Sequence, residues 1–228
     1  MRNFIKKILF VLILLIYACD IIQDKEQNFH DEYCNGDLVQ LWDESYSIYE
    51  TTELILDSLG GIIPPQIGCF ENLKKIDLSY SSLQGDIPPE IGNLLNLIEL
   101  NLIGNDLSGE IPAQIGNLTS LSTLILSHNQ LTGEIPSQIG GLYNLVELRL
   151  SNNQLIGEIP TEIINLENLT ILDLKVNQLS YLPTNICSLN LNFNNFTNVS
   201  FLDNHICPPY PECISLLDIS TQNTSSCP

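Results

Sequence analysis

The chain has 228 residues, of which 27 are acidic and only 8 are basic, giving a formal net charge of −19 at pH 7. All 27 acidic residues but only five basic ones lie after position 19, so this part alone carries 5 − 27 = −22. Such a negative field disfavours nucleic acid and anionic membrane surfaces as partners, although charge alone does not identify a partner.

The first nineteen residues, MRNFIKKILFVLILLIYAC, place basic residues before an apolar run over 8–18, a pattern typical of an export signal. The run is shorter than the roughly 20 residues of a membrane-spanning helix. Ile16 does not suit an ordinary cleavage site before Cys19. The segment IYAC instead resembles a bacterial lipobox, although Tyr17 is unusual in one, and this implies that Cys19 is acylated. We therefore expect an exported protein of the cell envelope, attached to the membrane only through lipid; a freely secreted protein is the alternative.

Two short segments follow the predicted signal. Residues 20–33 are polar and acidic without a clear period, which indicates a flexible tether. Residues 34–50 place Leu38, Leu41, Trp42 and Tyr46 near helical spacing. We interpret this segment as an N-terminal cap that packs on the first repeat.

The centre of the chain is a repeat array over residues 51–198. The 24-residue block LIELNLIGNDLSGEIPAQIGNLTS returns nearly intact twice, and shortened or partial blocks bring the array to about seven units. Within a block, Leu124 and Leu126 alternate with polar or variable residues, which predicts a short strand with one buried face. Because one unit cannot bury its own leucines, the units must stack with their strands parallel. The blocks begin at Thr51, Leu73, Leu97, Leu121, Leu145, Leu169 and Ile186.

A column of asparagines recurs at the ninth position of the unit, where the chain turns inward and leaves backbone groups without sheet partners. Stacked side-chain amides can satisfy those groups. Ser81 interrupts the column, so we expect weaker bracing near the N-terminal end. The members of the column are Asn105, Asn129, Asn153, Asn177 and Asn194.

The consensus LxxLxLxxNxLxGxIPxxIGxLxx resembles the plant-type leucine-rich repeat of plant receptor ectodomains, pectinase inhibitors and many bacterial surface proteins. The resemblance implies an α/β repeat solenoid, a right-handed superhelix with a concave parallel sheet and a convex side of short helical or irregular turns. One departure is the segment LSYLP from Leu179, where the consensus has LxGxIP. We expect this unit to end after 17 residues, at the strand that Ile186 opens, so that the convex side thins out.

The cysteines predict stapled ends. Without Cys19, the remaining six can all pair in an oxidising compartment. We expect a bridge from Cys34 to Cys69 at the front. Two further bridges should form among the other four cysteines, which lie in the last 42 residues, and three of these belong to the C-terminal cap predicted over residues 199–228. A zinc site is disfavoured because PPYPE separates Cys207 from Cys213, and no metal or cofactor is implied. The six are Cys34, Cys69, Cys187, Cys207, Cys213 and Cys227.

Side chains between the buried leucines should form columns across the sheet. We expect Lys75 to pair with Glu53 or Glu99, and Arg149 to pair with Asp173. The candidate binding patch combines two isoleucines that we expect to be exposed with polar neighbours, as recognition surfaces do. It comprises Asn101, Ile103, Ile125, His128 and Arg149.

Catalysis has little support in the sequence. HExxH, GxSxG and P-loop motifs are absent, and the three histidines fall in the tether, the array and the C-terminal cap.

The sequence contains five Asn-x-Ser/Thr sequons. A eukaryote would glycosylate several of them, whereas in a bacterium they have no meaning. They lie at Asn117, Asn168, Asn195, Asn198 and Asn223.

We interpret the chain as a non-catalytic envelope module that binds a protein, or a glycan, through the concave face. An inhibitor of a secreted hydrolase and a structural surface spacer are the alternatives, and one scaffold serves all three uses. The sequence does not separate them.

Overall fold

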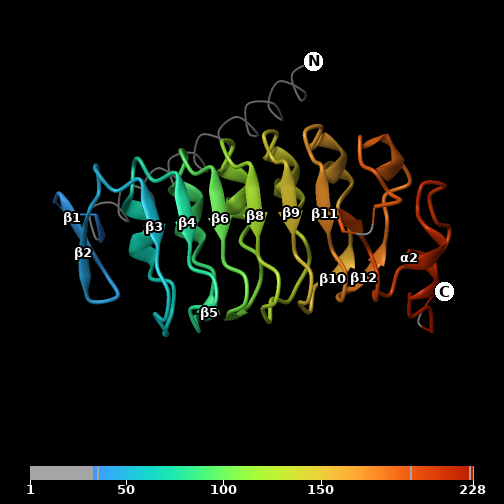
Figure 1. Cartoon of the computed structure of the whole chain (residues 1–228), viewed down its shortest axis with the longest axis horizontal. Helices are drawn as coiled ribbons and strands as arrows, with labels where there is room; N and C mark the ends of the chain where they lie inside the picture. The colour runs from blue at the N-terminus through green and yellow to red at the C-terminus, as the bar shows by residue number, and fades with distance from the viewer. Residues whose placement is uncertain (1–32, 35, 196, 226, 228) are drawn as a thin grey trace, which may run out of the picture.

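The computed structural model describes residues 33–34, 36–195, 197–225 and 227, which form one elongated stack of repeats (Figure 1). The predicted export signal, Cys19 and residues 20–32 of the predicted tether lie outside the described residues. The stack carries a seven-stranded parallel sheet in the order β13-β11-β9-β8-β6-β4-β3. Its strands are β3 (Glu53–Ile55), β4 (Lys75–Asp77), β6 (Glu99–Asn101), β8 (Thr123–Ile125), β9 (Glu147–Arg149), β11 (Ile171–Asp173) and β13 (Val199–Ser200).

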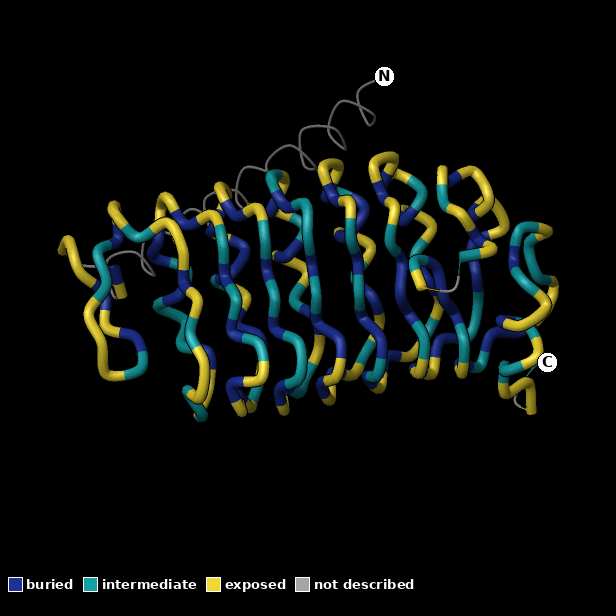
Figure 2. Tube along the Cα trace, in the orientation of Figure 1, coloured by how far each residue is buried: buried dark blue, intermediate teal, exposed yellow. Residues whose placement is uncertain are grey.

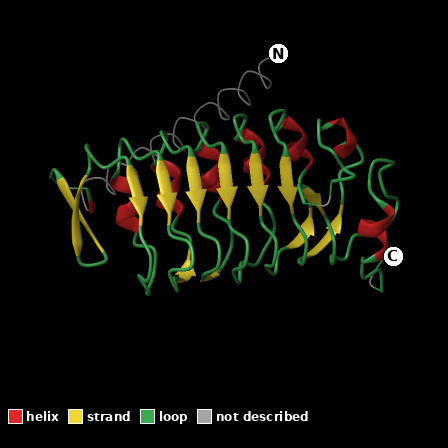
Figure 3. Cartoon of the chain, in the orientation of Figure 1, coloured by secondary structure: helices red, strands yellow, loops and turns green. Residues whose placement is uncertain are grey.

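Short 3₁₀ helices cover the other side of the stack (Figure 3). Most of them start directly after a proline, whose extended backbone, with φ near −65° at Pro112 and Pro136, turns the chain away from the sheet. The helices are η1 (Pro65–Cys69), η2 (Pro89–Asn93), η3 (Ala113–Asn117), η4 (Ser137–Gly141), η5 (Thr161–Asn165) and η6 (Ile186–Ser188).

A narrow flank joins the sheet to the helices. On it, β5 (Gln84–Asp86) pairs with β7 (Asp106–Ser108), and β10 (Ile156–Glu158) pairs with β12 (Gln178–Tyr181), all in parallel. These short ladders continue the repeat-to-repeat hydrogen bonding after the chain has left the main sheet.

The core lies between the sheet and the helices, as the buried residues along each turn of the tube show (Figure 2). Leu121, Leu124 and Leu126 are all 0% exposed, and the same positions are buried in the neighbouring repeats. Complete burial of one leucine side chain stabilises the fold by about 1.5–3 kcal/mol. The buried residues form one continuous cluster from Cys34 to Ile214, so the leucines of each repeat are covered by those of its neighbours.

The buried asparagines tie consecutive repeats together. Asn129 Nδ2 donates to the carbonyl oxygens of Leu102 and Leu126 at 3.0 and 3.1 Å, and its Oδ1 accepts the backbone N–H of Leu107 at 3.1 Å. Ser81 keeps one link to the preceding repeat, because its Oγ donates to the Leu56 carbonyl at 3.2 Å. The pattern of Asn129 recurs at Asn105, Asn153, Asn177 and Asn204.

Two predictions are wrong: Ile186 does not open the last strand of the sheet, and Asn194 does not belong to the asparagine column. Ile186 begins η6, and the last strand of the sheet is β13, in which Ser200 pairs with Asp173, 27 positions earlier. Asn194 is exposed, and Asn204 fills the place in the column. The reason is that this unit is longer than the others, since it forms both a 3₁₀ helix and an additional turn before the chain re-enters the sheet. The helix η6 has three residues where η1 to η5 have five each, in line with the expected thinning of the convex side. The stack nevertheless continues beyond residue 198, because β13 (Val199–Ser200) still pairs with β11.

The N-terminal cap is a hairpin rather than a helix. The strands β1 (Leu38–Leu41) and β2 (Glu44–Ser47) are antiparallel, and Trp42 and Asp43 form the turn with φ of 45° and 69°. Burial alternates along β1, as in a strand: Val39 and Leu41 are buried, and the residues before each of them are exposed. The Trp42 indole N–H donates to the Ile62 carbonyl at 3.0 Å, which fixes the hairpin to the first repeat.

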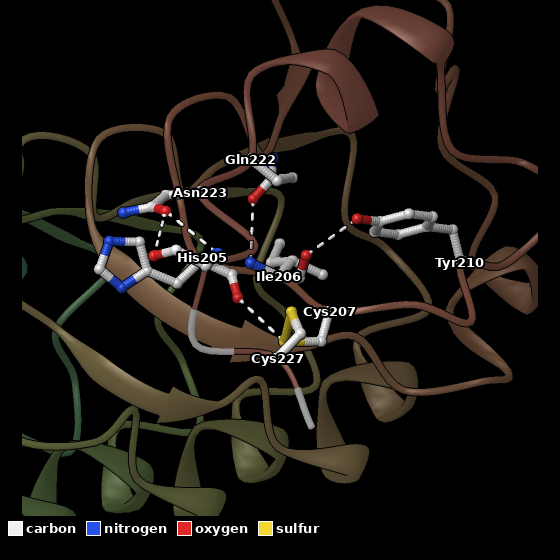
Figure 4. Close-up of a disulfide and its surroundings, with 8 residues drawn as sticks. His205, Ile206, Cys207, Tyr210, Gln222, Asn223 and Cys227 are labelled. Atoms are coloured by element: carbon white, nitrogen blue, oxygen red, sulfur yellow. Dashed lines mark hydrogen bonds between the residues drawn. A yellow bond between two sulfur atoms is a disulfide. The ribbon is translucent and has the colours of Figure 1, made fainter.

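The C-terminal cap satisfies the backbone beyond the last strand. Helix α2 (Leu216–Ser220) presents Asp218, only 3% exposed, whose Oδ1 accepts the Phe201 N–H at 2.9 Å. Gln222 Oε1 accepts the Ile206 N–H at 3.1 Å, and the Tyr210 hydroxyl donates to the Ile206 carbonyl at 3.0 Å (Figure 4). The cap thereby supplies the contacts that a further repeat would make.

Three disulfides staple the two caps, as the cysteine count predicted. Cys34 bonds to Cys69 at the front of the stack, so the expected front bridge is confirmed. At the other end, Cys187 bonds to Cys213, and Cys207 bonds to Cys227 (Figure 4). Covalent links at the open ends limit fraying where a repeat has only one neighbour.

The glycine of the IPxxIG motif has a packing role. A Cβ built on Gly116 would lie 2.4 Å from the Gln138 carbonyl oxygen in the next repeat, and Gly68, Gly92 and Gly140 meet the same restriction. Ile164 replaces this glycine only in the repeat that precedes the irregular unit, where it packs on the core. The glycine therefore sets how closely neighbouring 3₁₀ helices approach.

We expect Asn204→Leu to lower the free energy of unfolding by about 1–3 kcal/mol, because it leaves buried backbone groups unpaired. Asn194→Leu is the matched control, since the exposed Asn194 side chain lies outside the column. Denaturant unfolding of both variants checks the assignment. Equal stabilities would contradict the placement of Asn204 in the column.

We expect Gly116→Ala to lower the free energy of unfolding by about 1–3 kcal/mol, because its Cβ meets backbone rather than a movable side chain. Asn117→Ala, at the exposed neighbouring position, should change stability by less than about 0.5 kcal/mol. Thermal or urea unfolding measures both variants, and a Gly116→Ala protein as stable as the control would refute the packing role.

Candidate binding surface

The outer face of the seven-stranded sheet, called the sheet face below, presents aligned columns of side chains. The strand register places Asn101 of β6, Ile125 of β8 and Arg149 of β9 side by side in one column. Strand spacing of about 4.8 Å brings each of these residues next to the following one. The complete column reads Ile55, Asp77, Asn101, Ile125, Arg149, Asp173 and, on β13, Ser200.

The structure brings only part of the predicted patch together. Asn101, Ile125 and Arg149 adjoin in register, and Ile103 follows β6, but the two isoleucines are half-buried rather than exposed as predicted. His128 lies beyond the strand at a left-handed position, exposed, with its Nε2 3.5 Å from Asn152 Nδ2.

Ion pairs organise the C-terminal half of the sheet face. Arg149 contacts Glu147, and its Nη1 lies 4.0 Å from Asp173 Oδ2, as predicted for this pair. Lys175 Nζ lies 3.6 Å from the same Asp173 oxygen, while Asp173 itself is only 5% exposed. Two cations therefore face two carboxylates in this half, and one of these carboxylates is buried.

Among the described residues, the N-terminal half of the sheet face has a single ion pair. Lys75 Nζ lies 2.9 Å from Glu99 Oε2, one of the two partners predicted for it. The hydrogen bond to Glu99 raises the pKa of Lys75, although burial opposes the shift. Within the described part of the chain, Lys75, Arg149 and Lys175 are three of only four basic residues, and all three are committed to carboxylates on this face.

A rim of left-handed residues borders the sheet face where each strand turns toward the flank. Tyr80 lies on this rim with φ of 51° and is 70% exposed. Its ring lies against Gly104, since a Cβ there would be 2.4 Å from Tyr80 Cδ1 and Cε1. The rim, with φ between 51° and 71°, comprises Ser58, Tyr80, Gly104, His128, Asn152, Val176 and Asp203.

Sequence reasoning missed Tyr80 and did not include Ile55 in the patch. Ile55, on the first strand of the sheet, is 58% exposed. One signal for Tyr80 was available in the repeat alignment, because Gly104 is the only glycine at its repeat position in the array. A glycine there indicates that a neighbouring side chain occupies the space of the missing Cβ.

The described residues give no geometry for catalysis or metal binding. Ser127 is buried and accepts a hydrogen bond from Ser151 Oγ at 3.0 Å, so it is not a free nucleophile beside His128. Among the described residues, no group of three or more histidine, cysteine, aspartate or glutamate side chains could hold a metal ion. In the same part of the chain, no helix is both long and apolar enough to cross a bilayer.

The flank carries a hollow of its own. This hollow of about 930 Å³ is lined by residues of four successive repeats, among them Ile87, Ile111 and Ile156 together with prolines. Carboxylates of Asp86, Glu110 and Glu134 also line it. It lies on the flank rather than on the sheet face.

Comparison with known proteins identifies the fold family. Models described as "Leucine Rich Repeat" match residues 72–94 and 96–118, and one described as "Leucine Rich repeats (2 copies)" matches residues 119–162. A chain of the BIR3–SERK2 complex from Arabidopsis thaliana is 34% identical, with a TM-score of 0.51, over 66% of this chain and 79% of that one. The chain therefore belongs to the leucine-rich repeat proteins, as its consensus predicted.

Plant receptors are among the similar structures. The Arabidopsis receptor kinase HAESA, in complex with the peptide hormone IDA and the co-receptor SERK1, is 42% identical with a TM-score of 0.63. The match covers 68% of this chain but only 26% of HAESA, so this protein spans about a quarter of that receptor chain. A plant ice-binding protein is 32% identical with a TM-score of 0.60, over 76% of this chain and 55% of that one. The curated proteins contain no match.

We expect the double variant Arg149→Met, Lys175→Met to lose about 3 kcal/mol of unfolding free energy, because it leaves the buried Asp173 carboxylate without a cation. Adding Asp173→Asn should recover most of the loss, since the neutral amide needs no countercharge. Urea unfolding at neutral pH compares the double and triple variants. A double variant as stable as the unaltered protein would contradict the role assigned to this charge network.

Proposed function

We propose that the protein is a non-catalytic binding module that holds a segment of a protein partner against its sheet face. The observation that carries the proposal is the column in which Asn101, Ile125 and Arg149 offer an amide, an apolar side chain and a cation on three adjacent strands. Mixed apolar and polar groups on one exposed surface are typical of recognition sites. HAESA, solved with a peptide hormone, shows that a similar repeat scaffold serves a peptide-binding receptor.

The side chains of this column are already ordered before a partner arrives. Asn101 Nδ2 donates to Asp77 Oδ1 at 3.2 Å, and Asn101 Oδ1 accepts the Ile103 N–H at 3.2 Å. Arg149 is fixed between Glu147 and Asp173. Because little side-chain freedom remains to be lost, binding to this face costs less conformational entropy than binding to a mobile surface.

The proposed location is outside the cytosol, in the cell envelope. Three disulfides among the described residues are what an oxidising compartment produces. All six cysteines after Cys19 are used in these bridges, so Cys19 is not needed for a disulfide and is free for the acylation that IYAC suggests. The proposed lipid anchor would attach the solenoid to the membrane through residues 20–33.

Crosslinked affinity capture from native cells tests the function. We expect the full chain to capture a protein partner, and a variant carrying Asn101→Ala, Ile125→Thr and His128→Ala to lose it. The matched control carries Asn117→Ala, Gln154→Ala and Ile156→Thr, all at exposed positions away from the sheet face. Both variants must first melt like the unaltered protein, so that loss of capture reports the surface and not unfolding.

The outcomes separate the alternative functions. Equal capture by both variants would place binding elsewhere, and capture of nothing would favour a structural spacer. If the captured partner is a secreted hydrolase that loses activity on binding, the module acts as an inhibitor. If the captured species is a polysaccharide rather than a protein, the proposed partner class is wrong.

A further inference from the structure

The N-terminal half of the sheet face exposes two large apolar side chains. Ile55 is 58% exposed on β3, and Tyr80 is 70% exposed on the adjoining rim. The isoleucines farther along the face are only partly exposed; they are Ile103, Ile125 and Ile171. The apolar contact area available to a partner is therefore largest over the first strands of the sheet.

Tyr80 is exposed but held in place. Its backbone N–H donates to the Ile103 carbonyl at 2.9 Å, and its ring lies against Gly104. A fixed aromatic ring provides a large apolar contact and loses little conformational freedom on binding. Tyr80 thus has the properties of an anchor residue in a protein interface.

Charge on the sheet face differs between its two halves. Glu53 and Asp57 are exposed near Ile55 and form no ion pair among the described residues, and Asp77 pairs with Ile55 in the strand register. Lys75 is bound to Glu99, and the exposed Lys74, which directly precedes β4, forms no ion pair among the described residues. In the other half, by contrast, Arg149 and Lys175 balance Glu147 and Asp173. Carboxylates therefore outnumber basic side chains on the same half of the sheet face that exposes Ile55 and Tyr80.

We propose that the partner docks on this N-terminal half through an extended segment in which a large apolar side chain adjoins lysine or arginine. This inference rests on the proposed function and specifies the chemistry of its partner. One apolar side chain of the segment packs on Ile55 and another packs on Tyr80, while the cationic groups face Glu53, Asp57 and Asp77. Electrostatic complementarity of this kind sets specificity and the association rate.

Defined peptides of equal length test the inference on the full chain. One peptide combines arginine and lysine with leucine and phenylalanine, a second replaces the basic residues by glutamate, and a third replaces the apolar residues by serine. Fluorescence anisotropy measures binding at low and high salt. We expect the first peptide to bind best, with an affinity that falls as salt screens the charges.

Matched variants locate the contact. Tyr80→Ala, Ile55→Ser and the pair Glu53→Gln, Asp57→Asn should each weaken binding of the basic–apolar peptide, by about tenfold for Tyr80→Ala. The controls are Tyr143→Ala, which is 60% exposed between η4 and β9, Ile156→Ser, 46% exposed on β10, and the pair Glu110→Gln, Glu134→Gln on the flank. Each control should bind the peptide as the unaltered protein does.

Three results would overturn the inference: tighter binding of the acidic peptide, equal effects of Tyr80→Ala and Tyr143→Ala, or binding of none of the three peptides. The capture experiment distinguishes these failures from failure of the proposed function. If a protein is captured and lost with the Asn101, Ile125 and His128 substitutions while the peptide test fails, the sheet face binds a partner of different chemistry. If both tests fail, the sheet face is not a binding surface.

Discussion

The hydrogen bonds of the buried asparagines impose the constraint on which the stack depends. Each amide connects the carbonyl groups of two successive repeats and accepts an N–H from the preceding one, as at Asn129. These backbone groups lie where the chain leaves the sheet, so water cannot reach them and no strand pairs with them. Because an unpaired buried polar group is costly, each repeat must lie in one register against its neighbour. The alignment of the sheet-face columns follows from that register.

A stack built in this way has open ends, and the two caps close them by different means. At the front, a hairpin covers the first repeat and Cys34–Cys69 holds it there. At the back, Asp218 and Gln222 supply the hydrogen bonds that a further repeat would have made, and two disulfides fix the segment that carries them. The regular middle needs no such covalent support, since every repeat there has two neighbours.

The rigidity of the stack makes the sheet face a preorganised surface. The basic side chains Lys75, Arg149 and Lys175 are held in ion pairs on the face itself. The same leucine register that buries the core leaves Ile55 and Tyr80 in solvent, next to carboxylates that lack a countercharge. The consensus leucines are buried in the core and cannot contact a partner. Function on this fold therefore depends on the variable positions between them.

The sequence by itself determined the parallel stack and the register of the regular strands, because these follow from a period of 24 residues that each regular repeat obeys. It also predicted the pair of Arg149 with Asp173, left two partners open for Lys75, and suggested the front bridge because Cys34 and Cys69 flank the start of the array. It could not place the last strand, because Leu189 and Leu191 imitate the strand pattern and only the pairing of Asp173 with Ser200 excludes them. It also misjudged the cap around Trp42 and the exposure of Ile103 and Ile125. Burial and the hairpin depend on contacts between residues distant in sequence, as does the position of Tyr80 over Gly104, so only the tertiary structure could decide them.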